Sequence, residues 1–176
     1  MGDIIIYLID TNVLVSIRNR ADSSEIYSGL IRLARDGIAW TVRQVFDELK
    51  DQGASLQFIQ KYRTDFVISA EQQYCAGVRE KMEIVRTKAK WLNPGEGGSN
   101  PDPADPWLVA VAAHHKYVVV TNERQTSEFK IPAACRIEGI KCRCILGPHF
   151  LYEVGLVKTY NPAHISPDAF FAKGEG

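Results

Sequence analysis

The chain has 176 residues, of which 45% are hydrophobic and 24% are charged, and its formal net charge at pH 7 is zero. A chain of this length and composition is expected to form one globular domain with a sizeable core. Its neutral charge argues against a polybasic surface for nucleic acid, so any such binding must be local.

The N-terminus and the hydropathy predict a cytoplasmic protein. The chain begins without a basic leader, and its apolar run from Ile4 to Ile9 is too short for a signal peptide. No stretch reaches the roughly 18 apolar residues that cross a membrane, so we expect no membrane contact. In that compartment cysteines stay reduced, and we expect four free thiols. These are Cys75, Cys135, Cys142 and Cys144.

The first half of the chain alternates short apolar runs with amphipathic segments. The run from Ile4 to Ile9 is typical of a strand buried on both faces. Asp10 ends this strand and can cap a helix that continues through Ile17. A second helix is expected to begin at Ser23-Ser24 and to end near Asp36-Gly37. The other elements predicted here are a strand at 38–42, a helix carrying Val45, Phe46 and Leu49 inward, a short helix at 56–62 and a strand at 66–68.

The second half continues this alternation. An amphipathic pattern from Glu71 to Trp91 predicts a protruding helix or a helical pair. The segment from Leu92 to Pro106 is rich in proline and glycine and predicts a loop. Asp105 then fits the N-cap of an apolar helix that ends at His115, with Pro106 at the first helical position. The other elements predicted here are strands at 118–121 and 142–145 and a short helix at 150–154.

Strands that alternate with helices predict the α/β class. We expect a three-layer α/β/α sandwich with a mainly parallel central sheet. We assign residues 1–159 to this domain and residues 160–176 to a C-terminal tail that has little to fold around.

Four polar clusters lie where predicted strands end or predicted helices begin. Because the carboxyl ends of parallel strands face one edge of a sheet, clusters far apart in sequence can meet there. Converging carboxylates repel one another unless a cation lies among them, and Mg²⁺ or Mn²⁺ prefers such oxygen ligands. The pattern therefore predicts a divalent-metal site suited to phosphate chemistry. The clusters are Asp10-Thr11-Asn12, Asp47-Glu48, Asp102 with Asp105, and Thr121-Asn122-Glu123.

These motifs, in this order, resemble the PIN-domain family of metal-dependent ribonucleases, over roughly residues 4 to 150. The resemblance implies a PIN-like fold and an endoribonuclease that cleaves single-stranded or loop RNA, leaving a 5′-phosphate and a 3′-hydroxyl. It also implies that the chain is the toxin of a toxin–antitoxin pair with a cognate antitoxin protein. The matching segments are Leu8-Ile9-Asp10-Thr11-Asn12-Val13, Val45-Phe46-Asp47-Glu48-Leu49, 105–112 and 118–123.

The resemblance also implies roles for individual residues. Asp10 and Asp105 would ligate the metal, and Glu48 would hold a metal-bound water or bridge a second ion. Thr11 and Asn12 would hydrogen-bond the ligands or the scissile phosphate, and Thr121 would position the attacking water. The family commonly has Asp at the fourth acidic position, where this chain has Glu123 beside Asn122. Either of these two side chains could complete the site.

A basic stretch beside the site is a candidate RNA rim, although a solvated helix face is its alternative interpretation. Tyr74 or Trp91 could add stacking surfaces for bases. The basic residues proposed for RNA binding are Arg79, Arg86, Lys88 and Lys90.

Other interpretations stay open at this point. A catalytically silent PIN-like module that binds RNA or a protein is the main alternative to the nuclease, and homodimer formation is left open. We attribute His114 and His115 to a favourable interaction with the helix dipole rather than to metal binding. Apolar residues near the C-terminus are expected to offer an antitoxin-docking surface; these are Phe150, Leu151, Tyr152, Phe170 and Phe171.

Overall fold

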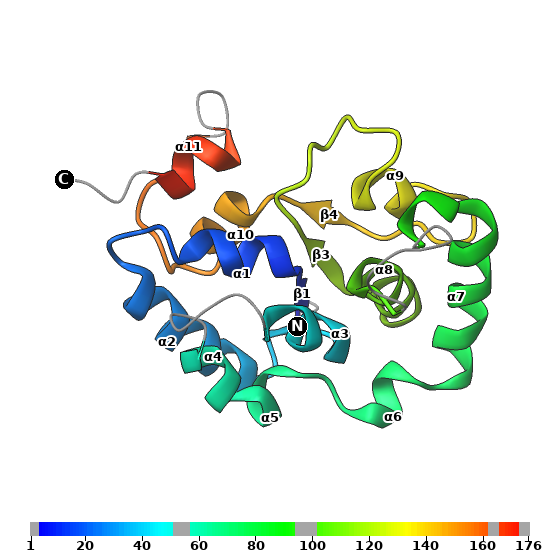
Figure 1. The fold of residues 1–176 in the computed structure, drawn as a ribbon, viewed down its shortest axis with the longest axis horizontal. Coiled ribbons are helices and arrows are strands. Elements are labelled where there is room, and N and C mark those ends of the chain that lie inside the picture. Colours follow the sequence, from blue (N-terminus) through cyan, green and yellow to red (C-terminus); the bar gives the residue numbers. More distant parts are fainter. Residues whose placement is uncertain (1–3, 51–56, 94–101, 162–165, 173–176) are drawn as a thin grey trace.

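The computed structural model describes residues 4–50, 57–93, 102–161 and 166–172. Within these residues the sheet has four strands, all parallel, in the order β2-β1-β3-β4. Helices cover both of its faces (Figure 1), which confirms the predicted α/β/α sandwich. The strands are β1 (Tyr7–Ile9), β2 (Ala39–Trp40), β3 (Val118–Val120) and β4 (Cys144–Ile145).

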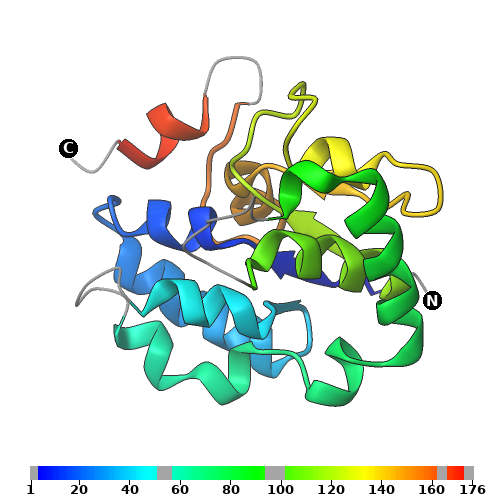
Figure 2. The same ribbon diagram turned by 45° about the vertical axis from the view of Figure 1, so that its right-hand side comes forward.

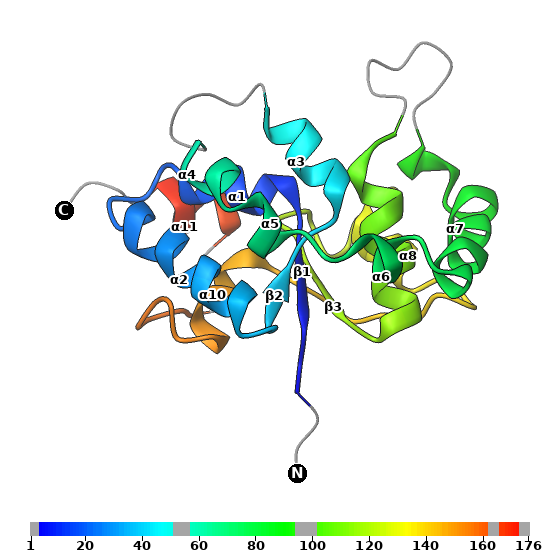
Figure 3. The ribbon, with the colours of Figure 1, turned by 90° about the horizontal axis from the view of Figure 1, so that it is seen from below.

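Two groups of helices form the outer layers (Figures 1 and 3). One layer contains α1 (Thr11–Ile17), α2 (Ser23–Arg35), α10 (Gly147–Glu153) and α11 (Pro167–Ala172). The other contains α7 (Ala76–Lys88), α8 (Ala104–His115) and α9 (Ile131–Cys135). The shorter elements are α3 (Arg43–Leu49), α4 (Gln57–Lys61), α5 (Arg63–Phe66), α6 (Ala70–Gln73) and the 3-10 helix η2 (Lys90–Leu92).

The two central strands are buried along their whole lengths, as their apolar runs predict. In the parallel register Ile9 lies opposite Val120. The backbone NH of Asp10 donates to the Val120 carbonyl at 2.9 Å, which extends this pairing by one residue. The polar residues that follow β1 and β3 therefore leave the sheet side by side at its carboxyl edge.

Helix α8 lies between the sheet and α7 (Figure 2). Every residue from Leu108 to Ala112 is fully buried, as expected for a helix that is apolar on all sides. Helix α3 contacts both α1 and α8, and Figure 3 shows it at the end of the sheet opposite the N-terminus. The start of α8, the start of α1 and helix α3 thus meet near the same edge.

The structure corrects two local predictions. The strand predicted at 66–68 is reduced to an isolated bridge between Thr41 and Val67, because Phe66 ends α5 and packs on Phe46 with ring centroids 6.2 Å apart. Asp105 is not the N-cap of its helix. Pro103 occupies that position and Ala104 begins α8, so Asp105 lies inside the first turn.

The C-terminal prediction is also wrong in part. Helix α11 forms and packs on α1 and α10, with Phe170 and Phe171 buried. The guanidinium of Arg20 lies 4.4 Å from the centre of the Phe170 ring and donates to the Phe170 carbonyl. Phe150 and Leu151 are fully buried too, so of the five proposed docking residues only Tyr152 is exposed. The four buried residues complete the core instead of forming a docking surface.

Two further predictions concern other segments. Most of the predicted proline- and glycine-rich loop, residues 94–101, lies outside the described residues. All four cysteines lie within them, and none forms a disulfide, as predicted. Among the described helices, none has the length and hydrophobicity needed to cross a membrane.

Candidate functional site

Four carboxylates converge at the carboxyl edge of the sheet. Asp10 follows β1, Glu48 lies in α3, Asp105 lies in the first turn of α8 and Glu123 follows β3. Their charges interact, because Asp105, Glu123 and Glu48 each raise the pKa of Asp10. Residues separated by up to about two thirds of the chain thus share one electrostatic environment, as the sequence predicts.

Asp10 is the buried member of this group, with 3% of its surface exposed. Its Oδ2 accepts a hydrogen bond of 2.8 Å from the Thr121 hydroxyl. Burial raises the pKa of Asp10 well above its usual range, the charge of Asp105 raises it further, and the hydrogen bond from Thr121 lowers it. Although Asp10 occupies the N-cap position of α1, its side chain makes no capping hydrogen bond. The carboxylate is therefore directed to the cluster.

Asp105 lies close to the same charges. Burial raises the pKa of Asp105 to about 7, with further contributions from Glu123 and Glu48, whereas Lys130 lowers it. The first turn of a helix favours a negative charge. That Asp105 nevertheless resists ionisation reflects first its burial and then the negative charges of Glu123 and Glu48. A divalent cation among these oxygens would relieve the repulsion.

Glu48 connects three segments of the site. The Thr11 hydroxyl donates a hydrogen bond to its Oε2, and the backbone NH of Ala104 donates to its Oε1 at 2.9 Å. Because Ala104 begins α8, Glu48 satisfies one of the free amide groups at that helix start. Its neighbour Asp47 instead forms ion pairs with Lys50, Arg43 and Arg63. Of this acidic pair, only Glu48 faces the cluster.

The fourth position is occupied by Glu123. It contributes to the raised pKa of both Asp10 and Asp105. Its carboxylate accepts a hydrogen bond of 2.7 Å from the backbone NH of Ile131 and lies 3.4 Å from the Lys130 ammonium. These contacts hold it at the edge of the site.

Asn122 points elsewhere. Its Nδ2 donates to the Asn12 carbonyl, and its Oδ1 is buried without a hydrogen-bond partner in the described part of the chain. A Cβ added at Gly147 would lie 2.5 Å from that oxygen, so Asn122 is directed towards the start of α10. The geometry therefore favours Glu123 over Asn122 as the fourth member of the site.

Asn12 and Thr121 form the framework beneath the carboxylates. Thr121 is fully buried, and its hydroxyl accepts from Asn12 Nδ2 at 3.1 Å and from the Glu123 backbone NH at 3.2 Å. Asn12 Oδ1 accepts from the Asn122 backbone NH at 2.9 Å. Since the Thr121 hydrogen is donated to Asp10, this geometry favours a role for Thr121 in orienting that carboxylate.

The basic residues proposed as an RNA rim are exposed on α7 and η2. Arg86 forms an ion pair with Glu83 at 3.3 Å, and Lys88 donates to the Glu138 carbonyl at 3.4 Å. Trp91 and Phe129, both exposed, pack edge to face with centroids 5.9 Å apart. Tyr74 packs on Trp107 instead. Phe129 immediately precedes the two residues that contact Glu123, which links this aromatic pair to the site.

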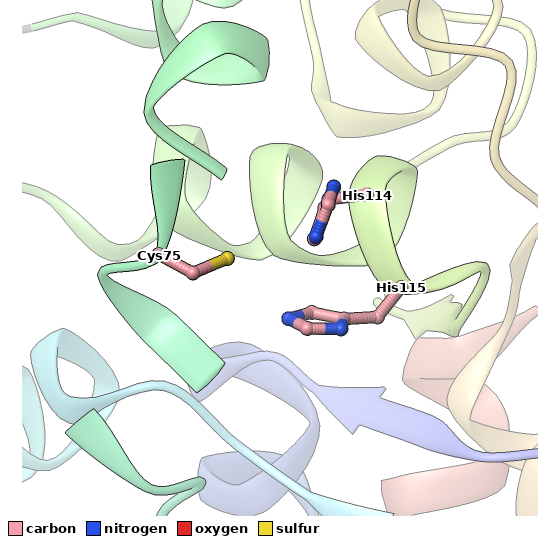
Figure 4. A group of neighbouring side chains, drawn as sticks. All are labelled: Cys75, His114 and His115. Atoms are coloured by element: carbon pink, nitrogen blue, oxygen red, sulfur yellow. The ribbon is translucent and has the colours of Figure 1, made fainter. Parts of the chain in front are cut away.

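A second group of potential metal ligands lies at the other end of α8. The ligand atoms of Cys75, His114 and His115 all lie within 4.8 Å of one another, and Figure 4 shows the three side chains gathered between α7 and α8. No sequence motif connects these residues. Cys75 lies 39 positions before His114 and 40 before His115 and forms no motif with them, so only the packing of α7 on α8 reveals the group.

Fold and site together define an α/β protein with a four-carboxylate cluster at the carboxyl edge of a parallel sheet. The chain belongs to the family described as "Domain of unknown function (DUF4411)", whose profile matches residues 7–147. This range extends from the start of β1 to the start of α10 and includes both groups of potential ligands. Comparisons with curated proteins and with solved structures found no match.

Proposed function

We propose that this protein is a divalent-metal-dependent endoribonuclease with Mg²⁺ or Mn²⁺ as its cofactor. The observation that carries the proposal is the convergence of Asp10, Glu48, Asp105 and Glu123 at one sheet edge. The pKa of Asp105 is raised to about 7, and that of Asp10 is also raised. Carboxylates gathered this closely, with raised pKa values, are typical of sites that hold a hard cation.

The donor atoms of these residues suit such a cation. All four side chains offer oxygen, the donor that Mg²⁺ and Mn²⁺ prefer. Bound there, the ion would neutralise phosphoryl oxygens and make water a better nucleophile near neutral pH. In this proposal Asp10 and Asp105 hold the cation, while Glu48 and Glu123 complete the carboxylate cluster around it. Thr121 and Asn12 keep Asp10 in place through the hydrogen bonds described above.

Because RNA is an anion, it needs cationic and aromatic contacts beside the carboxylate cluster. Lys130 lies 3.4 Å from Glu123. Phe129 precedes Lys130 in the sequence, and the exposed ring of Trp91 packs on that of Phe129. Aromatic faces stack with unpaired bases, a mode of contact that suits single-stranded or loop RNA. Lys88 and Lys90 would add charge on the same side. This arrangement supports RNA rather than a small phosphate ester as the substrate.

The biological setting that we propose is a toxin–antitoxin pair, in which a cognate antitoxin blocks the carboxylate cluster. A basic antitoxin side chain placed among these oxygens would satisfy them in place of a metal ion. Expression of the wild-type protein alone should then arrest growth, and co-expression with an adjacent gene should restore it. Harmless expression of an RNase-active protein would remove the toxin role and leave the nuclease role standing.

The nuclease proposal is tested by cleavage of single-stranded RNA in Mg²⁺ or Mn²⁺. The wild type should cleave, EDTA should stop the reaction, and Asp10→Asn and Asp105→Asn should each lower the rate by more than about 100-fold, since even residues that only support metal ligands contribute 10–100-fold. Asp47→Asn, outside the cluster, is the matched control and should retain activity. Cleavage that persists in EDTA would contradict the proposal.

A silent binding module is the second candidate, because Lys130 already neutralises part of the charge of Glu123. In that case the wild type would bind RNA or a protein without cleaving RNA under any metal condition.

A further inference from the structure

We propose that Cys75, His114 and His115 form a second metal site, specific for Zn²⁺ or a similar transition-metal ion. Their ligand atoms lie within 4.8 Å of one another, and one thiol with two imidazoles is a donor set that Zn²⁺ accepts. Figure 4 shows all three side chains directed into one space between the start of α7 and the end of α8.

The site is separate from the carboxylate cluster. Asp105 lies in the first turn of α8 and His115 ends the same helix. At 1.5 Å per residue, these two residues are about 15 Å apart along the helix axis. The donors differ as well, because Mg²⁺ and Mn²⁺ prefer oxygen whereas thiolate selects softer ions. One protein could thus hold two different metals at opposite ends of α8.

Protein contacts already fix the His115 ring. Its Nε2 lies 2.9 Å from the Gln72 carbonyl oxygen, and its plane stacks on Tyr117 with centroids 5.1 Å apart and an interplanar angle of 17°. Contacts of this kind hold a ligating histidine in its productive orientation. The ring is therefore positioned before an ion arrives.

The position of His114 depends on Gly77. A Cβ added at Gly77 would lie 2.0 Å from His114 Cε1, so a larger residue could not accommodate the ring where it lies. Glycine lowers helix stability, yet Gly77 occupies the first turn of α7. Its presence there is explained by the space that His114 requires. His114 is exposed, which leaves its ring able to rotate towards an ion.

Cys75 would supply the sulfur ligand, and metal binding would not cost it a capping hydrogen bond. It is the N-cap of α7, but its side chain makes no capping hydrogen bond. The start of a helix favours negative charge, which suits a metal-bound thiolate. Zinc bonds of about 2.0–2.3 Å require the ligand atoms of Cys75 and His114 to approach His115 somewhat further, by side-chain rotation. The bound ion would join the start of α7 to the end of α8 and leave a fourth position for water.

The test uses the full-length protein, purified under reducing conditions and loaded with Co²⁺ as a spectroscopic substitute for Zn²⁺. The wild type should bind one ion with a sulfur-to-cobalt charge-transfer band. Cys75→Ser should lose the band and bind Zn²⁺ more than about 100-fold more weakly, as expected for loss of a direct ligand. Serine is a favoured N-cap, so this variant should fold. His114→Gln, at an exposed position, should also weaken binding.

Two controls distinguish metal binding at this site from metal binding elsewhere in the molecule. The Cys135 thiol hydrogen-bonds the thiols of Cys142 and Cys144, so these three cysteines are another potential source of the band. A double variant, Cys142→Ser with Cys144→Ser, tests that alternative. It should keep the band, as should Asp10→Asn, which acts only on the carboxylate cluster. No charge-transfer band in the wild type, or a band that survives Cys75→Ser and disappears in the double variant, would overturn the proposal.

Discussion

Thr121 donates a hydrogen bond of 2.8 Å to Asp10, which lies 111 residues earlier in the chain. Both residues are buried, and each follows a central strand of the sheet. The bond is made possible by the parallel register that places Ile9 opposite Val120. The topology of the sheet therefore fixes the position of the most buried carboxylate in the candidate site.

This bond gives the first prediction. Thr121→Val keeps the shape of the side chain but removes the hydroxyl, and Asp10 and Asn12 each lose a partner. An unsatisfied buried polar group costs about 1–3 kcal/mol. We expect a loss of unfolding free energy of that order and a 10–100-fold drop in RNA cleavage, as for other residues that orient metal ligands. Denaturant unfolding and single-turnover cleavage measure the two effects.

Thr121→Ser is the matched control, since it retains the hydroxyl. It should keep most of the activity of the wild type. If Thr121→Val cleaved RNA as well as Thr121→Ser, the hydroxyl would have no part in orienting Asp10.

The second prediction concerns the stability of the metal-free protein. The pKa of Asp105 is about 7 in the folded state, above the value of about 3.9 expected in the unfolded chain, and the pKa of Asp10 is raised as well. Between these values the folded state binds more protons than the unfolded state, so stability falls as pH rises from about 4 to about 7. In Asp105→Asn this contribution is absent.

The difference between the wild type and Asp105→Asn isolates the effect from other titrating groups. In EDTA at pH 8, we expect the variant to be more stable by on the order of 1–3 kcal/mol, and at pH 4 the difference should largely vanish. Mg²⁺ should stabilise the wild type more than the variant. A variant that is less stable than the wild type at pH 8 would show that repulsion is not the dominant effect.

Elements that depend on residues close together in the sequence were predicted better than contacts between distant segments. Central strands and most helices follow from local patterns, as at Val118 to Val120, and the parallel topology then brings the acidic residues together. The N-cap prediction for Asp105 failed because Pro103 and Ala104 offered an earlier helix start that the loop composition hides.

Contacts between distant segments were the least predictable. Phe170 and Phe171 follow a polar segment and carry no periodic signal, yet Arg20 and α10 provide a surface that buries them. Phe66 could be a strand or a helix residue by propensity, and packing on Phe46 decides between them. The group of Cys75 with His114 and His115 depends in the same way on how α7 packs across α8.

The third prediction distinguishes Glu123 from Asn122. Glu123→Gln removes a charge that acts on both Asp10 and Asp105, so cleavage should require at least about tenfold more Mn²⁺. Asn122→Ala removes a side chain that is directed towards Gly147, and the Mn²⁺ requirement should stay near that of the wild type. Single-turnover cleavage over a series of Mn²⁺ concentrations measures both. The reverse ranking would assign the fourth position to Asn122.

The last prediction concerns the basic and aromatic surface beside the site. Replacing Arg86, Lys88 and Lys90 together with Ala should weaken RNA binding and lower the logarithmic salt slope by up to about 2, since each phosphate neutralised on a single strand contributes about 0.7. Trp91→Ala should weaken binding with little change in slope, because stacking is not ionic. Arg32→Ala, exposed on α2 in the opposite layer, is the control and should leave binding unchanged. A salt slope that is unaltered in the triple variant would identify the basic stretch as an ordinary solvated helix face.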